Sequence, residues 1–361
     1  MTNATLIPVI DISESQADQA SIAKRLVDAA AEHGFLYIKN TGLDISVAQV
    51  EQAFGISKIL FNSPLEDKQR CKMQKNNQGW SGMHTETLDP KTQRVGDFKE
   101  GFNFGTFSNS KANQPIPKSI EPYQADLAAF SESCHKLCCK LLLLFGIGLE
   151  VNPPDFFSRA HSSDEASRAI LRFLHYPPPS ATPSAQKSDV RAGAHSDYGS
   201  VTLLFRLRGQ AGLEILTATD TWVPVPVCPP GTENDPSPPI LVNIGDLFSY
   251  WTNGLLRSTV HRVTFSSSNT SNNAHTAGLA DDESTADPRY SIVYFGQPAN
   301  DTPLTAVPSE RVQNFKGGLA TASPGNPYAE RKVLTADEHL NMRLQATYLQ
   351  LYSNGENKEK E

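Results

Sequence analysis

The strongest constraint on the fold is an alternating hydrophobic pattern in the second half of the chain. Val201, Leu203, Phe205 and Leu207 occupy every second position, and side chains two positions apart point to the same face of a strand. Short β-rich segments also occur at residues 240–244, 259–265 and 290–295, between loops rich in Pro, Ser and Gly. Many short strands separated by such loops are typical of a β-sandwich or a jelly roll.

The first half of the chain has the three- and four-residue period of helices. Hydrophobic residues predict helices over residues 17–33, 45–60 and 124–145, with a strand over residues 35–39. Gly146 and Gly148 are expected to end the longest helix. The predicted fold is therefore mainly β, with helices flanking the strands.

Charge and cysteine content narrow the classes of function. The 361 residues include 39 Asp and Glu against 32 Lys and Arg, and an acidic chain is a poor electrostatic partner for nucleic acid or an anionic membrane. Five cysteines form no even framework, which favours a reducing compartment. No apolar run reaches the ~20 residues of a membrane span. We expect a cytoplasmic protein, monomeric by default, without a nucleic-acid or membrane partner.

His195 and Asp197 form the first candidate site for chemistry. Residues i and i+2 of a strand share a face, so an imidazole and a carboxylate at this spacing can reach one metal ion. His84 and Glu86 have the same spacing, and either pair alone is therefore weak support for a metal site.

His261 adds a third possible ligand from another β-rich segment, well downstream of His195. Two histidines and one carboxylate bind one face of an ion and leave positions open, which suits Fe(II) and oxygen chemistry. A zinc hydrolase can be built from the same ligand types. The ligand types alone leave both kinds of site open.

Arg289 and Ser291 favour the first of these two interpretations. They open the β-rich segment at residues 289–295 and share one face of it. A planar guanidinium beside a hydroxyl is a good receptor for a carboxylate. A ligand that chelates the metal at one end and carries a carboxylate at the other, such as 2-oxoglutarate, fits this combination.

Further motifs occur in a characteristic order along the chain. They are residues 7–11, 34–42, 61–68 and 99–102 in the first part, and 174–177, 195–197, 212–213, 242–246, 253–254, 261–263 and 289–291 in the second. With these motifs the chain resembles the Fe(II)- and 2-oxoglutarate-dependent dioxygenases of the isopenicillin N synthase-like branch over nearly its whole length.

The resemblance implies a double-stranded β-helix (jelly-roll) core surrounded by helices. Residues 1–120 then form the N-terminal helical and strand region of the family. Residues 121–350 form the catalytic jelly-roll region with its long supporting helix, and the charged tail at 351–361 frays. The loop at 266–288 looks longer than is usual in the family and is expected to be a surface excursion.

The resemblance also implies a role for each site residue. His195, Asp197 and His261 bind Fe(II). Arg289 and Ser291 hold the distal carboxylate of 2-oxoglutarate, and Tyr176 helps to bind the same cosubstrate. Many members have asparagine two positions before that tyrosine, whereas this chain has Leu174, so the cosubstrate is expected to lose one polar contact there.

Two further polar residues are candidates for a supporting role around the metal. Ligating histidines usually donate their second ring N–H to a partner, and Asn243 or Asp246 can serve. The same Asn-Ile-Gly-Asp run can also simply form a turn at the end of a strand.

The implied function is oxidation of an unactivated C–H bond in a small molecule of specialised metabolism. The reaction uses 2-oxoglutarate and O2, gives succinate and CO2, and leads to hydroxylation, desaturation or ring closure. One alternative is an oxidase of the isopenicillin N synthase type, which keeps the iron ligands and the Arg-x-Ser pair without using 2-oxoglutarate. The other is a non-catalytic jelly-roll protein that binds a small acid.

Overall fold

The computed structural model describes most of the chain. The described residues are 7–13, 18–162, 166–178, 181–182, 189–265, 288–315 and 333–347. Most of the predicted excursion at 266–288 and all of the predicted frayed tail at 351–361 lie outside them.

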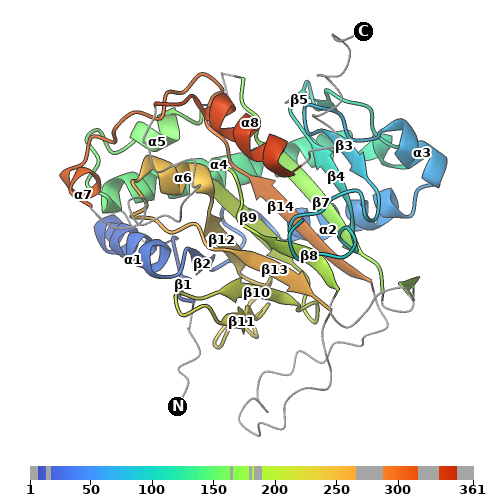
Figure 1. The fold of residues 1–361 in the computed structure, drawn as a ribbon, viewed down its shortest axis with the longest axis horizontal. Coiled ribbons are helices and arrows are strands. Elements are labelled where there is room, and N and C mark those ends of the chain that lie inside the picture. Colours follow the sequence, from blue (N-terminus) through green and yellow to red (C-terminus); the bar gives the residue numbers. More distant parts are fainter. Residues whose placement is uncertain are drawn as a thin grey trace, which may run out of the picture.

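Two β-sheets lie at the centre of the molecule (Figure 1). The larger has eight strands in the order β1 (Val9–Ile10), β2 (Phe35–Ile38), β12 (Ile240–Ile244), β9 (Val201–Arg206), β14 (Arg289–Phe295), β7 (Ile170–Tyr176), β4 (Glu100–Phe104) and β3 (Gly79–Ser81). The smaller has four, in the order β11 (Trp222–Pro224), β10 (Leu213–Leu216), β13 (His261–Thr264) and β8 (Val190–His195). A separate hairpin joins β5 (Phe107–Ser108) and β6 (Lys111–Ala112).

Helices pack against the larger sheet and around its ends. The long ones are α1 (Gln19–Glu32), α2 (Val47–Phe61), α4 (Gln124–Gly148) and α8 (Ala336–Thr347). The short ones are α3 (Leu65–Arg70), the 3-10 helix η2 (Lys118–Tyr123), α5 (Phe156–Arg159), α6 (Asp246–Trp251) and α7 (Glu310–Gln313). Both α2 and α4 contact β14, while α1 packs along α4. None of the helices in the described part of the chain is long and apolar enough to cross a membrane.

The strands β14 and β7 each present alternate residues to two different cores. Ile292 and Tyr294 belong to the large core that the helices share with the eight-stranded sheet. Val293, Leu174 and Tyr176 belong to a smaller core between the two sheets. Because successive side chains of a strand point to opposite faces, the residues that alternate with the helix-facing ones look into the space between the sheets.

The structure confirms the predicted element types. The helices expected over 17–33, 45–60 and 124–145 are α1, α2 and α4. The strands expected over 35–39 and 240–244 are β2 and β12. Those expected near 201–207, 259–265 and 290–295 are β9, β13 and β14.

The longest helix, α4, continues through Gly146 and ends at Gly148, one of the two glycines predicted to end it. A Cβ atom on Gly146 would clash with the carbonyl oxygen of Pro154, and one on Gly148 would clash with that of Ala23. The two glycines therefore also allow other backbone to pack closely against the end of α4.

His161 ties α5 to the segment that leads from the candidate metal site into β9. The side chain is buried, with Nδ1 2.7 Å from the carbonyl oxygen of Phe157 and Nε2 2.8 Å from the hydroxyl of Ser200. The carbonyl can only accept, so Nδ1 donates and Nε2 accepts from Ser200. Burial lowers the pKa of His161 to about 4, and the ring is neutral at neutral pH.

We expect His161 to make the folded state less stable as the pH falls from about 6.5 to about 4. Over this range an unfolded chain takes up a proton at the histidine, whereas the folded chain does not, so the free energy of unfolding decreases by up to about 3 kcal/mol. Denaturant unfolding at several pH values should show a shallower decrease for His161→Gln than for the parent. An identical pH dependence in the two proteins would contradict this assignment.

Candidate metal centre and adjoining cavity

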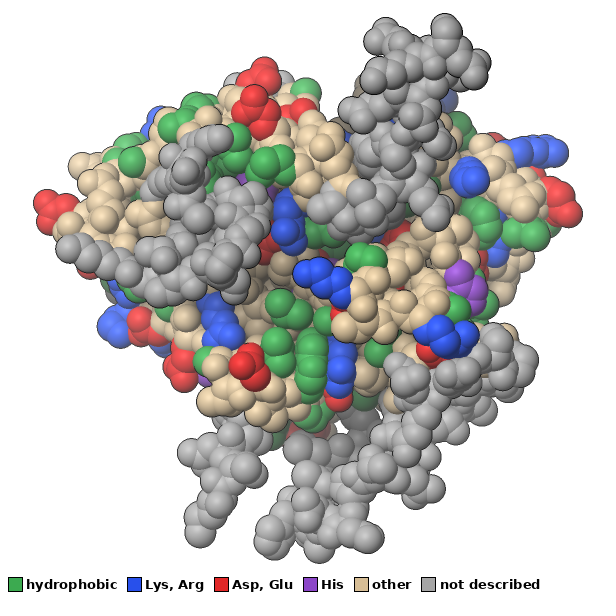
Figure 2. Space-filling model, in the orientation of Figure 1, with side chains coloured by type: hydrophobic (Ala, Val, Ile, Leu, Met, Phe, Trp, Pro, Cys, Tyr) green, Lys and Arg blue, Asp and Glu red, His purple; other side chains and the backbone are tan. Residues whose placement is uncertain are grey.

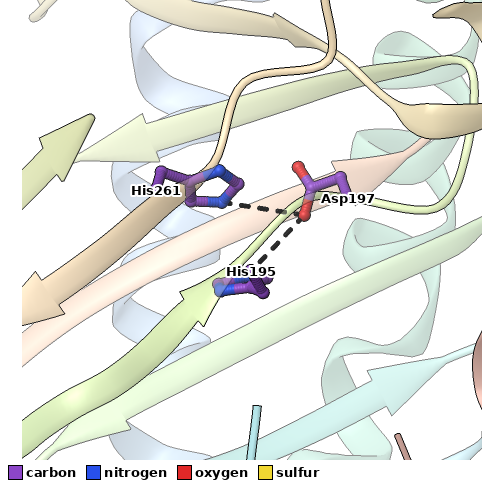
Figure 3. A group of neighbouring side chains, drawn as sticks. All are labelled: His195, Asp197 and His261. Atoms are coloured by element: carbon purple, nitrogen blue, oxygen red, sulfur yellow. Dashed lines mark ion pairs between the residues drawn. The ribbon is translucent and has the colours of Figure 1, made fainter. Parts of the chain in front are cut away.

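His195, Asp197 and His261 come together at one end of the space between the sheets (Figure 3). The Nε2 atoms of His195 and His261 lie 3.9 and 3.8 Å from Oδ1 of Asp197. The two imidazole rings are 4.4 Å apart between centroids. One ligand atom from each residue lies within 4.8 Å of the others, so these three side chains can hold one metal ion.

The backbone explains how the three side chains meet. His195 is the last residue of β8 and His261 the first of β13, and the two are direct partners in the antiparallel ladder of the smaller sheet. Asp197 lies beyond the end of β8, in the connection that crosses to β9 of the larger sheet. The predicted shared strand face is therefore wrong for His195 and Asp197, which are brought together by the turn after the strand.

Both histidines present Nε2 to the site because their Nδ1 atoms have other partners. The Nδ1 of His195 lies 2.7 Å from the carbonyl oxygen of Gly193, and the Nδ1 of His261 lies 3.2 Å from that of Thr259. A carbonyl accepts, so each Nδ1 carries the proton and each Nε2 keeps its lone pair for a metal. The partners of the two rings are thus backbone carbonyls. The prediction that Asn243 or Asp246 accepts from them is wrong.

The electrostatics of the site favour metal binding. Desolvation and the neighbouring His261 lower the pKa of His195 to about 3, so this imidazole is neutral. Burial alone would raise the pKa of Asp197, but the two histidines and a hydrogen bond from Asn243 outweigh it and lower the pKa. A neutral imidazole beside an ionised carboxylate is the protonation state that a divalent metal requires.

Asn243 holds the carboxylate of Asp197 in place. Its Nδ2 donates to Oδ2 of Asp197 at 2.7 Å, while the histidines approach Oδ1. Thr202, directly opposite Asn243 in the β12–β9 ladder, also hydrogen-bonds to this carboxylate. The Oδ2 atom of Asp197 is therefore engaged by Asn243, and Oδ1 faces the two imidazoles.

We expect Asn243→Ala to weaken Fe(II) binding by about 10- to 100-fold, the usual effect of removing a partner that orients a metal ligand. Equilibrium dialysis with metal analysis measures the affinity. Asn103→Ala is a matched control, because Asn103 is also a buried strand asparagine, but its side chain binds Asn77 and not a candidate metal ligand. Equal iron affinities of the parent and the Asn243 variant would contradict this role.

A cavity of about 130 Å³ extends from the three residues into the space between the sheets. Its walls include Arg289 and Ser291 of β14 and Tyr176 of β7, so the structure brings all six predicted site residues to one cavity. Arg289 and Ser291 share a face as predicted, and both are almost fully buried.

The guanidinium of Arg289 is anchored at the cavity wall. Its Nε donates to the carbonyl oxygen of Ala211 at 2.9 Å, and its Cζ lies 4.7 Å from the centre of the Tyr176 ring. Arg289 faces Tyr176 across the β14–β7 ladder, and Ser291 faces Leu174. Leu174, two positions before Tyr176, lines the same wall. The place where a polar contact was expected to be lost is therefore apolar.

Three charged residues that line the cavity were not predicted to have a role: Lys99, Arg168 and Arg172. Lys99 and Arg172 are both buried and contribute to its wall. The alternative histidine–carboxylate pair at 84 and 86 is not a metal site, because Glu86 binds Arg172 while His84 contacts the carbonyl oxygen of Gly96. The Lys-Glu-Gly-Phe motif at 99–102 was the only sequence signal that included Lys99.

On the outer surface, the charged side chains do not form a continuous patch on the face drawn in Figure 2. Lys and Arg lie singly towards the middle of that face, and many Asp and Glu lie nearer its edge. Four basic side chains do gather in the wall of the cavity: Lys99, Arg168, Arg172 and Arg289.

Comparisons with known proteins agree with this fold. Residues 7–124 match the N-terminal region of the non-haem dioxygenases typified by morphine synthesis, and residues 168–298 match the 2OG-Fe(II) oxygenase superfamily. A UPF0676 protein from Schizosaccharomyces pombe is 35% identical, over 84% of this chain and 86% of its own. Proline hydroxylase buaE from Petromyces alliaceus is 30% identical, over 93% of this chain and 97% of its own.

Solved structures share the architecture. A 2OG-Fe(II) oxygenase family protein from Caulobacter crescentus superposes with a TM-score of 0.70 at 25% identity, covering 95% of this chain and 99% of that one. A Neurospora crassa protein crystallised with alpha-KG gives a TM-score of 0.71 at 23% identity, covering 95% and 97%. These likenesses confirm the predicted jelly-roll core.

The chain belongs to the Fe(II)- and 2-oxoglutarate-dependent oxygenases. It is an oxidoreductase of the dioxygenase class, and its cofactor and cosubstrates are those of the family, Fe(II), 2-oxoglutarate and O2. The donor set of the site fits this metal, since two imidazoles and one carboxylate on one face are the ligands of non-haem Fe(II) oxygenases.

Proposed function

We propose that His195, Asp197 and His261 bind Fe(II), and that Arg289, Ser291 and Tyr176 bind 2-oxoglutarate. The observation that carries the proposal is that these six side chains, from two facing sheets, line one cavity. The two histidines belong to the smaller sheet, and Asp197 lies in the connection from β8 to β9. The three residues proposed to bind 2-oxoglutarate belong to the larger sheet.

Bound Fe(II), together with 2-oxoglutarate and O2, supplies the chemistry that oxidises an unactivated C–H bond. The three protein donors hold one face of the ion and leave the cavity face for other ligands. Arg289 offers a planar guanidinium to the distal carboxylate, and the Ser291 hydroxyl offers one further donor. The buried walls keep water away from the reacting groups.

The names of relatives support a small-molecule substrate. They include a proline hydroxylase and 2-oxoglutarate-dependent dioxygenases from several fungi, and a 1-aminocyclopropane-1-carboxylate oxidase from Dictyostelium. We therefore propose that this enzyme hydroxylates, desaturates or cyclises a small molecule of specialised metabolism. The five free cysteines support a reducing, cytoplasmic site of action, and we propose that the enzyme acts there as a monomer.

Turnover of the cosubstrate tests this function. In air, protein supplied with Fe(II) and 2-oxoglutarate should form succinate slowly even without a substrate, and should stop when iron is chelated. Succinate measured by mass spectrometry and O2 uptake measured in parallel provide the two readouts. Iron-dependent O2 uptake without succinate would overturn the role of 2-oxoglutarate and support the oxidase alternative.

A further inference from the structure

The charged residues in the cavity wall are strongly biased towards cations. Apart from Arg289, they include Lys99, Arg168 and Arg172. The carboxylate that lines the cavity is that of Asp197, and in the described part of the chain no other acidic residue belongs to its wall. Arg168 lies under α8, where it binds Asp337 and Asn341, whereas Lys99 and Arg172 lie deeper in the wall.

Lys99 and Arg172 are held in position by carboxylates behind them. Arg172 donates to both oxygens of Glu86 at 2.5 and 2.6 Å, and Lys99 binds Glu86 at 3.2 Å and also Asp97. Ser81 donates to Glu86 at 3.0 Å. Glu86 and Asp97 are buried but do not line the cavity, so the two cations form its surface and their counter-charges lie outside it.

Glu86 and Lys99 keep their charges in the fold. Burial alone would raise the pKa of Glu86 and lower that of Lys99, but the opposite charges around them outweigh burial and shift both pKa values the other way. Burying four charges is a poor way to stabilise a protein, since apolar residues of similar size do as well or better. A buried charge cluster in a cavity beside a metal centre is therefore a candidate for ligand binding.

Lys99 has donor capacity left for a ligand. An ammonium group has three N–H bonds, and among the described residues Asp97 and Glu86 are the acceptors within reach of its Nζ. Asp97 also accepts from the backbone N–H of Gly193 at 3.0 Å, and the Gly193 carbonyl oxygen is the partner of His195 Nδ1. An anion held by Lys99 thus lies close to the metal centre.

We propose that Lys99 and Arg172 bind a carboxylate of the substrate, and that the substrate is a small acid with an apolar body. The inference rests on the proposed function, in which Arg289 already holds the distal carboxylate of 2-oxoglutarate. Arg172 lies four residues along β7 from Tyr176, the partner of Arg289, or about 13 Å at the rise of a strand. Arg172 and Arg289 are therefore separate positions on one wall, whereas Lys99, which precedes the partner of His175 in β4, lies nearer to Tyr176.

The rest of the wall fits the apolar part of such a ligand. Residues from four different segments contribute hydrophobic side chains there: Leu88, Ile170, Phe295, Leu340 and Leu344. A carboxylate on Lys99 and Arg172 leaves the remainder of the molecule against these side chains, and in reach of the metal.

Calorimetric titration of the anaerobic Fe(II)–2-oxoglutarate complex tests the proposal without turnover. The probes are phenylacetate and hexanoate, each with its primary amide as the neutral counterpart of equal size. We expect each acid to bind at least about tenfold more tightly than its amide, the size of a hydrogen bond to a charged group. Equal binding of acid and amide, or binding of neither, overturns the proposal.

Variants identify the residues responsible. Lys99→Met and Arg172→Gln should each weaken acid binding about tenfold or more and leave amide binding unchanged. Lys68→Met is the matched control, because Lys68 is another buried lysine, paired with Glu100, that does not line the cavity. If the two variants instead weaken 2-oxoglutarate binding, these cations hold the cosubstrate and the proposal is overturned.

The acid–amide comparison in the parent protein does not depend on the folding of any variant. The visible absorption band that 2-oxoglutarate produces with bound Fe(II) is recorded first in the same sample. A parent protein without this band contradicts the proposed function itself. A parent with the band but without a preference for acids contradicts only the substrate class.

Discussion

Replacing Asp197 by alanine is expected to lower the affinity for Fe(II) by more than about 100-fold, beyond the loss caused by removing an outer partner of a ligand. The substitution removes the one carboxylate of the metal site and leaves two imidazoles. Succinate formation from 2-oxoglutarate should fall at least as much. Equilibrium dialysis with metal analysis gives the affinity, and mass spectrometry gives the product.

Two controls separate loss of the ligand from loss of the fold. Asp197→Asn keeps the shape of the side chain but removes its charge, and should also weaken iron binding. Asp44→Ala removes a carboxylate that pairs with Lys140 and does not line the cavity, and should bind iron like the parent. Unchanged iron affinity in Asp197→Ala would show that these three residues are not the metal centre.

Replacing Arg289 by alanine is expected to weaken 2-oxoglutarate binding by about 2–5 kcal/mol, which is roughly 30-fold to several thousand-fold. The guanidinium is almost fully buried, so the distal carboxylate would lose its partner in a site of low polarity. Iron binding should be unaffected, because Arg289 belongs to the other sheet. The dependence of succinate formation on 2-oxoglutarate concentration measures the change.

A buried arginine on the neighbouring strand provides a matched control. Arg206 faces Ser291 across the β9–β14 ladder, but it donates to the carbonyl oxygens of Val225 and Pro226 and does not line the cavity. Arg206→Met should therefore keep the parent affinity for 2-oxoglutarate. Arg289→Lys should restore part of the lost affinity, since lysine keeps the charge without the planar fork. An Arg289→Ala protein with parent affinity would contradict the assigned site.

Much of the site was predictable because strand geometry is regular. Arg289 and Ser291 share a face of β14 and both line the cavity, as their i and i+2 spacing predicts. His195 and His261 were predicted to come from different strands and are partners in one ladder. The position of Asp197 depends on a turn after β8, whose path local periodicity does not determine.

The parts of the site and fold that were not predicted depend on contacts between segments far apart in the chain. Lys99 and Arg172 meet at Glu86 through contacts between residues far apart in the chain, and hydrophobic periodicity carries no signal for such contacts. Gly146 and Gly148 were predicted to end a helix, and α4 does end at Gly148. Their close contact with the backbone at Pro154 and Ala23 is visible only in the tertiary structure.

The central claim is that 2-oxoglutarate binds to iron held by His195, Asp197 and His261, in the cavity that Arg289 lines. An anaerobic absorption titration tests it most directly, with Fe(II) added first and 2-oxoglutarate second. We predict a new visible charge-transfer band in the parent protein, which is absent or much weaker in His195→Ala and Arg289→Ala. Iron binding without a band in the parent, or a band of equal strength in both variants, would contradict the account.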